Sequence, residues 1–287
     1  MLHLTRKMRF LPYVLLIPAM GLLFIFKLYP IVLTLILSFK GDAGFTLEVY
    51  KKLFASSSFA KSLWTTIKMN VVMIPLQIFL AFVLSLLVNV KLKGIGVYRT
   101  IFYLPVTISI TVSCILWNVM LNPNSGIVNS IFMALGIPQQ DFFLNKSQAL
   151  WCIVILATWK GVGYWMMFLL AGLKNIDPAI SEAARVDGSG FFSTVIRITL
   201  PLIKRVLLFV FVANTTSNLL LFVPMQLITK GGPEESTNVL MFQAYQVAFK
   251  YYDRPEASAI VTIILILIIA ICAFQARLLG DKKEERS

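Results

Sequence analysis

The stretch ALWCIVILATWKGVGYWMMFLLAGL, residues 149–173, decides the fold of this chain. A helix needs about 20 predominantly apolar residues to cross the hydrocarbon core of a bilayer, which is about 30 Å thick. The stretch is long enough for one crossing, and its only charged residue, Lys160, lies about ten residues from either end. We therefore expect a membrane-spanning helix that has a lysine near the middle of the bilayer.

Five further stretches have the same apolar character. They cover residues 11–39, 66–90, 98–121, 202–228 and 256–279. These runs are continuously apolar, whereas the strands of a transmembrane barrel alternate over roughly 10 residues. The sequence predicts an all-α polytopic membrane protein in which a single domain, residues 1–287, contains six transmembrane helices. The first run exceeds the roughly 7–15 apolar residues of a signal peptide, so we expect an uncleaved span.

The composition agrees with a membrane protein. The chain is 58% hydrophobic and 14% charged, whereas a soluble domain has about 25% charged residues. Its formal net charge of +13 fits loops that hold Lys and Arg beside a membrane, so we expect contact with lipid and no nucleic-acid partner. The three cysteines, Cys114, Cys152 and Cys272, lie in apolar runs, and His3 is the single histidine. Neither a disulfide framework nor a metal site is therefore predicted.

The distribution of Lys and Arg predicts the orientation. Loops rich in these residues stay on the cytoplasmic side of the membrane. Placing the N-terminus inside assigns fifteen of them to the cytoplasm and nine to the outside, with Lys27 and Lys160 within spans. We therefore expect both termini in the cytoplasm. The residues assigned to the inside are Arg6, Lys7, Arg9, Lys91, Lys93, Arg99, Lys174, Arg185, Arg197, Lys204, Arg205, Arg277, Lys282, Lys283 and Arg286.

The longest inner loop, residues 174–201, has helical signals of its own. Asp177 followed by Pro178 is typical of a helix start, and Gly188 is placed to end that helix in a left-handed conformation. We expect Ser189 to cap a second short helix and Pro201 to stop it. Such a helical pair suits a docking surface for a soluble partner, or an amphipathic helix on the bilayer surface.

A motif in this loop carries a family resemblance. Glu182-Ala183-Ala184, Gly188, Ile198 and Leu200-Pro201 reproduce the pattern EAA-x3-G-x9-I-x-LP. The pattern resembles the signature loop of binding-protein-dependent ABC importer permeases. Other stretches resemble the carbohydrate-uptake branch of that family, of the maltose and glycerol-phosphate type. They are Tyr98-Arg99-Thr100, Leu104-Pro105, Asn122 with Gly126 and Asn129, the segments 159–166 and 229–237, and Ala257-Ser258-Ala259.

The resemblance implies a division of labour in the bacterial inner membrane. Two permease subunits, which we expect to be different chains, enclose the pathway, two cytoplasmic ATPase subunits drive it, and an external solute-binding protein delivers a sugar or oligosaccharide. The sequence has no G-x-x-x-x-G-K-[ST] phosphate loop, so we expect no cofactor here, with ATP and Mg²⁺ bound by the partner ATPase. We therefore expect a transport subunit and not an enzyme.

The resemblance also implies that the inner loop, residues 174–201, is a coupling loop that docks in a cleft of the ATPase. Small alanines permit close approach, a glycine supplies the turn, and Glu182 can pair with a basic residue of the partner. Docking of this kind would transmit ATPase closure to the spans. The residues expected to couple are Glu182, Ala183, Ala184, Asp187, Gly188, Leu200 and Pro201.

Polar and aromatic residues within the spans are candidates for the solute pathway. Polar groups at bilayer depth are costly, so each requires a partner or a cavity. By resemblance, Gly161, Tyr164 and Asn218 match solute contacts of maltose-type permeases, although packing within the bundle is an alternative for each. The full set of candidates is Trp159, Lys160, Gly161, Tyr164, Asn214, Ser217 and Asn218.

Lys160 departs from the family pattern, in which a small or apolar residue is more usual. There are two alternatives for its side chain. Either Lys160 faces the cavity and favours an anionic or strongly polar solute, or it snorkels or pairs with a backbone carbonyl. The glycines Gly161 and Gly163 leave room for backbone approach or for a local break in the helix. An importer of glycerol phosphate or another anionic polyol is therefore an alternative function.

A second alternative is an ion-coupled secondary transporter, which normally has acidic residues at mid-depth. No Asp or Glu lies in the core of an expected span, and the EAA loop favours the ABC permease.

Overall fold

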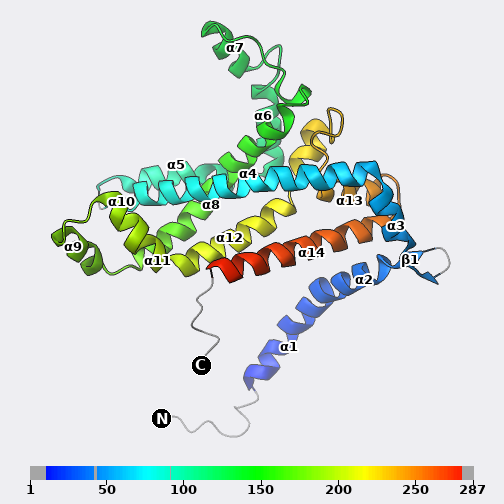
Figure 1. Cartoon of the computed structure of the whole chain (residues 1–287), viewed down its shortest axis with the longest axis horizontal. Coiled ribbons are helices and arrows are strands. Elements are labelled where there is room, and N and C mark those ends of the chain that lie inside the picture. The colour runs from blue at the N-terminus through cyan, green and yellow to red at the C-terminus, as the bar shows by residue number, and fades with distance from the viewer. Residues whose placement is uncertain (1–10, 42–43, 91, 280–287) are drawn as a thin grey trace. The chain divides into compact units, whose positions relative to one another are not determined.

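The computed structural model describes residues 11–41, 44–90 and 92–279 (Figure 1). The chain divides into two units, which are described separately. Unit 1 contains residues 1–56 and 244–263, and unit 2 contains residues 57–243 and 264–287. Several residues of the charge argument lie outside the described residues. They are His3, Arg6, Lys7, Arg9, Lys91, Lys282, Lys283 and Arg286.

Unit 1 begins with one continuous helical run. It consists of α1 (Leu11–Leu23), the π-helical turn η1 (Phe24–Leu28) and α2 (Tyr29–Leu37). Proline has no N–H to donate. The Tyr29 N–H before Pro30 bonds to the Phe24 carbonyl, five residues back, which widens the helix without ending it. A two-stranded antiparallel hairpin and a short helix follow, which are β1 (Lys40–Gly41), β2 (Gly44–Phe45) and α3 (Glu48–Ala55).

Unit 2 contains most of the remaining helices. Its first half comprises α4 (Ser57–Val88), α5 (Ile95–Thr107), α6 (Ile110–Met120), α7 (Ile127–Ala134), η2 (Phe142–Leu144) and α8 (Ala149–Lys174). Its second half comprises α9 (Pro178–Val186), α10 (Phe191–Thr194), η3 (Val195–Thr199), α11 (Leu200–Leu202), α12 (Lys204–Leu219) and η4 (Met225–Thr229). The helices α13 (Leu240–Phe249) and α14 (Arg254–Leu279) have residues in both units.

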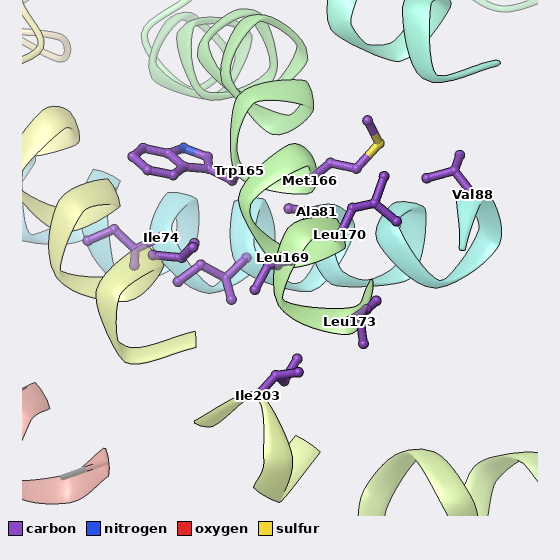
Figure 2. Packing of buried hydrophobic residues seen from close by; sticks show 11 residues of the cluster. Ile74, Ala81, Val88, Trp165, Met166, Leu169, Leu170, Leu173 and Ile203 are labelled. Atoms are coloured by element: carbon purple, nitrogen blue, oxygen red, sulfur yellow. The ribbon is translucent and has the colours of Figure 1, made fainter. Parts of the chain in front are cut away.

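The core of unit 2 lies where α8 packs on α4, α5 and α12. Figure 2 shows Ile74, Ala81 and Val88 of α4 beside the side chains of α8, with Ile203 next to the start of α12. Leu169 of α8 is fully buried in this cluster. The apolar stretch that decides the fold therefore forms the central helix of the unit.

The second half of α8 approaches α5 very closely. A Cβ atom added to Gly163 would lie 2.1 Å from the carbonyl oxygen of Phe102. Small residues allow the backbones of membrane helices to approach in this way. The expectation of backbone approach is therefore confirmed at Gly163, whereas a local break is wrong, because α8 is continuous from Ala149 to Lys174.

Four helices of the described part of the chain are long and apolar enough to span a membrane. They cover Leu16–Leu37, Ser57–Val88, Ala149–Lys174 and Arg254–Leu278. A fifth span results if the pair α5 and α6 is counted as one, although these helices meet at a bend of 96°.

Two of the six expected spans are not continuous helices. The run 98–121 breaks at Ile108, which has an extended backbone, and Ser109 caps α6 by accepting a hydrogen bond from the Thr111 N–H. Within the run 202–228, α12 ends at Leu219, irregular chain follows at 220–222, and a helical turn resumes. Apolar length alone does not detect these breaks, because the residues at which they occur, Ile108 and 220–222, are themselves apolar.

We predict that Gly163→Ala lowers the stability of the protein. The added methyl has to displace backbone of α5, and overpacking of this kind costs about 1–3 kcal/mol. Gly161→Ala is the matched control in the same helix, because its new Cβ would meet its nearest atom at an ordinary 3.7 Å. Thermal unfolding in detergent should show a lower midpoint for Gly163→Ala than for Gly161→Ala, and equal midpoints would contradict the close approach.

Candidate functional site

A cavity of about 400 Å³ opens between helices of unit 2. Drug-sized ligand sites have volumes of about 300–1,000 Å³, so the cavity is large enough for a small solute. Its wall combines side chains of five helices, α4, α5, α6, α8 and α12, with the chain that follows α12. The lining residues are Gln77, Val106, Ile110, Ala157, Lys160, Gly161, Tyr164, Trp165, Ser217, Asn218, Leu220, Leu221, Phe222 and Val223.

Three buried amides form a hydrogen-bonded cluster at one side of this cavity. Gln77 Oε1 accepts from Asn214 Nδ2 at 2.6 Å and from Asn218 Nδ2 at 2.9 Å. Asn218 Nδ2 also donates to Asn214 Oδ1 at 3.0 Å. The cluster joins α4 to α12 and satisfies polar groups that would otherwise be costly within a membrane.

Some polar groups of the lining have no partner within the part of the chain that the structure describes. They are Nε2 of Gln77, the hydroxyl of Tyr164 and the hydroxyl of Ser217. The ring of Tyr164 is 41% exposed and contacts Trp165 edge-on, with 4.9 Å between ring centroids. The cavity therefore offers uncharged hydrogen-bonding groups beside an accessible aromatic ring.

The structure brings most of the expected pathway residues together. Lys160, Gly161, Tyr164, Ser217 and Asn218 all line the cavity. The other two do not. Asn214 is completely buried behind the wall and bonds to Gln77, whereas the ring of Trp159 packs on Trp117, with 5.8 Å between centroids. For Trp159 the helical periodicity of α8 explains the difference from Lys160, because neighbours in a helix point to different faces.

Sequence reasoning missed Gln77, which holds the amide cluster together. The signal was available, because glutamine is costly within an apolar run such as 66–90 unless it has a partner. It also missed the wall at Leu220–Val223, where irregular chain at 220–222 leads into a helical turn, because the segment is uniformly apolar up to Pro224.

The ammonium group of Lys160 contacts the break between α5 and α6. Its Nζ donates to the carbonyl oxygens of Ile108 at 2.5 Å, Pro105 at 3.3 Å and Val106 at 3.4 Å. Pairing with backbone carbonyls, one of the expected alternatives, is therefore the arrangement present in the structure.

The inner loop contains the expected first helix, α9. Asp177 Oδ1 accepts a hydrogen bond from the Ala179 N–H at 2.9 Å and caps its start. At its end, Gly188 has a φ of +75°, and the Ser189 N–H bonds to the Ala184 carbonyl at 2.9 Å. This six-residue closure around a left-handed glycine is the Schellman motif. The predicted start and stop of this helix are confirmed.

The second helix of the loop differs from expectation. Gly190, not Ser189, occupies the capping position of α10, and the Ser189 hydroxyl instead accepts a bond from the Thr194 hydroxyl at 3.1 Å. Pro201 does not stop the helix either. The Leu200 N–H before it bonds to the Val195 carbonyl, so the π-helical turn η3 leads into α11, as η1 does before Pro30.

The coupling candidates have different exposures. Glu182, Ala183 and Asp187 are exposed, whereas Ala184 is 4% exposed and packs within the fold. Leu200 is half-buried and Pro201 exposed. Exposed apolar side chains surround the acidic ones, with Val186 at 87%, Phe191 at 66% and Phe192 at 78% exposure. This combination of charge and apolar surface is suited to contact with another protein.

The comparisons with known proteins identify the family. The family described as "Binding-protein-dependent transport system inner membrane component" matches residues 53–284, so the chain belongs to this family. It is therefore a multi-pass inner-membrane component of an ABC importer, a transport subunit and not an enzyme.

Two relatives and one solved structure illustrate the likeness. The lactose transport system permease protein LacF of Rhizobium radiobacter is 33% identical over 90% of this chain and 89% of its own length. The sn-glycerol-3-phosphate transport system permease protein UgpA of Salmonella choleraesuis is 28% identical over 96% of each chain. A chain of a bacterial alginate ABC transporter, solved with an alginate pentasaccharide-bound periplasmic protein, has the same fold. Its TM-score is 0.83 at 24% identity, over 96% of this chain and 95% of that one.

We predict that Gly188→Ala loosens the end of α9. An alanine at a φ of +75° is strained, at a cost of about 1 kcal/mol. Gly190→Ala is the matched control, because Gly190 has an ordinary φ of −71° and neither glycine has an atom within 4 Å of a new Cβ. Hydrogen exchange at the Ser189 amide should become faster in Gly188→Ala only. Equal exchange in both variants would count against the left-handed cap.

Proposed function

We propose that this chain forms half of the translocation pathway of an ATP-driven importer for a sugar or oligosaccharide. The observation that carries the proposal is the cavity in unit 2. Its uncharged amide and hydroxyl groups match the hydroxyl groups of a carbohydrate, and the ring of Tyr164 suits the C–H face of a sugar ring. The likeness to a lactose permease supports the same substrate class.

The proposed pathway uses six transmembrane segments. In this arrangement α5 with α6 forms the third span, and α12 with η4 forms the fifth, each interrupted where the chain borders the cavity. Both termini lie in the cytoplasm, and the whole chain acts as one transmembrane domain. Interrupted helices at membrane depth are tolerated where they line a cavity, which supports this assignment.

In the proposed complex this chain has four kinds of partner. A second, different permease chain completes the pathway, two cytoplasmic ATPase subunits bind ATP and Mg²⁺, an external solute-binding protein delivers the solute, and lipid surrounds the spans. Residues 174–201 dock on one ATPase subunit through the exposed side chains of α9 and α10. Figure 1 supports this division, because α9 and α10 lie at one end of the helices of unit 2 while the loop before α13 lies at the other.

Import of glycerol phosphate or another anionic polyol is the second candidate. The observation that favours it is the charge of Lys160 at the cavity, together with the likeness to an sn-glycerol-3-phosphate permease. An ion-coupled secondary transporter has no such support, because none of the residues that line the cavity is acidic.

We predict that Asn218→Ala weakens solute uptake by about tenfold, because it removes a polar group of the cavity wall and two hydrogen bonds of the amide cluster. Thr216→Val is the control on the same helix, since within the described residues the Thr216 hydroxyl bonds only to its own helix and to Cys272. Uptake of radiolabelled lactose and maltotriose by the reconstituted complex should fall in the first variant alone. If neither sugar is taken up by the unmodified complex while glycerol 3-phosphate is, the second candidate replaces the first.

We predict that Glu182→Lys uncouples ATP hydrolysis from transport. Reversing a charge at an interface costs several kcal/mol when its partner is left unpaired, so binding of the ATPase subunit should weaken by about tenfold or more. Glu48→Lys, which reverses an exposed carboxylate of α3, is the control. Co-purification of the ATPase in mild detergent and solute-stimulated ATP hydrolysis measure the effect. Full coupling in Glu182→Lys would place the ATPase contact elsewhere.

A further inference from the structure

All the hydrogen-bond donors of Lys160 bond to backbone carbonyl oxygens at the break between α5 and α6. A lysine ammonium has three N–H groups and no acceptor. Its partners are the carbonyl oxygens of Pro105, Val106 and Ile108, at 3.3, 3.4 and 2.5 Å. Among the described residues it has no carboxylate partner. The charge of this lysine is therefore compensated by backbone dipoles.

These carbonyls belong to the end of α5 and to the residue that follows it. The last carbonyls of a helix have no partner within that helix, and the hydrocarbon of a membrane supplies none. A cation at this position also interacts favourably with the negative end of the helix dipole. The chain turns by 96° immediately afterwards, so the lysine acts at the point where the direction of the backbone changes.

The same break forms one wall of the cavity. Val106 precedes it, Ile110 follows it, and both line the cavity together with Lys160. Any change in the bend between α5 and α6 therefore moves these two side chains relative to the amide cluster of α4 and α12. The position of the wall depends on what holds the break.

We propose that Lys160 is a positioning residue, which clamps the break between α5 and α6 and so sets the shape of the cavity, and that it does not select the solute by direct charge contact. The role in transport rests on the proposed function, since it requires the cavity to be the solute pathway. The clamp itself does not. Its three N–H groups are already occupied by carbonyls, which is why a solute anion finds no free donor there.

The clamp is tested by measuring the bend directly. Val97 on α5 and Val119 on α6 are both exposed and accept spin labels through Val97→Cys and Val119→Cys, after the three native cysteines are replaced by serine. Pulsed electron paramagnetic resonance on the assembled complex should give one narrow distance distribution. Lys160→Met should broaden or shift this distribution, whereas Lys160→Arg, which keeps charge and donors, should restore it.

Lys27→Met is the control, because Lys27 is an exposed lysine in another membrane helix and lies far along the chain from the break. An unchanged distribution in Lys160→Met overturns the proposal. Should that variant fail to assemble, Lys160→Gln keeps two N–H donors without the charge and must give an intermediate broadening. An unchanged distribution in the glutamine variant would equally reject the clamp.

A functional readout separates the clamp from the proposed pathway. Solute-stimulated ATP hydrolysis should fall about tenfold in Lys160→Met, as expected when hydrogen bonds from a charged group are lost, and recover in Lys160→Arg. Glucose and glucuronate, used as neutral and anionic competitors of uptake, should keep their relative potency. A changed ratio with an unchanged bend would show that the lysine selects solute and would refute the proposal. A changed bend with normal ATP hydrolysis would retain the clamp and refute the proposed pathway.

Discussion

Hydrocarbon provides no partner for a backbone N–H or C=O, so each such group in a membrane protein must be satisfied by the protein itself. An uninterrupted helix such as α8, which contains no proline, meets this requirement within its own backbone. The chain departs from it at two places in unit 2, the bend after Thr107 and the irregular segment after Leu219. At the first, Lys160 supplies hydrogen-bond donors, and at both the chain borders the cavity. The two places where the backbone leaves the regular helix are thus also the places where it forms the wall of the cavity.

The cavity has a mostly apolar wall with a few polar groups, and none of the residues that line it is acidic. The amides of Gln77, Asn214 and Asn218 bond to one another, which orients the groups that face the cavity. Preorganised neutral donors and acceptors suit a solute that carries many hydroxyl groups and little charge. The positive charge of Lys160 does not alter this description, because its donors point at carbonyl groups.

The inner loop, residues 174–201, has different physical requirements from the cavity. It lies outside the expected spans, where backbone groups can bond to water, so its short helices need only local caps. Asp177 and Gly188 provide these caps for α9, and the apolar side chains of Val186, Phe191 and Phe192 stay exposed. A short capped helix beside exposed apolar side chains is suited to contact with another protein, and α8 and α12 adjoin this loop in the chain.

The sequence by itself determined the class of the protein, the helix over the 149–173 stretch, and the capped first helix of the inner loop. These features depend on composition, apolar length and neighbouring residues, all of which are local. Tertiary structure alone decided that Gln77 of α4 reaches Asn214 and Asn218 of α12, that Trp159 turns toward Trp117, and that Lys160 meets the carbonyls at the break between α5 and α6. Each of these is a contact between residues more than forty positions apart, and the choice among many possible partners is made by how the helices pack.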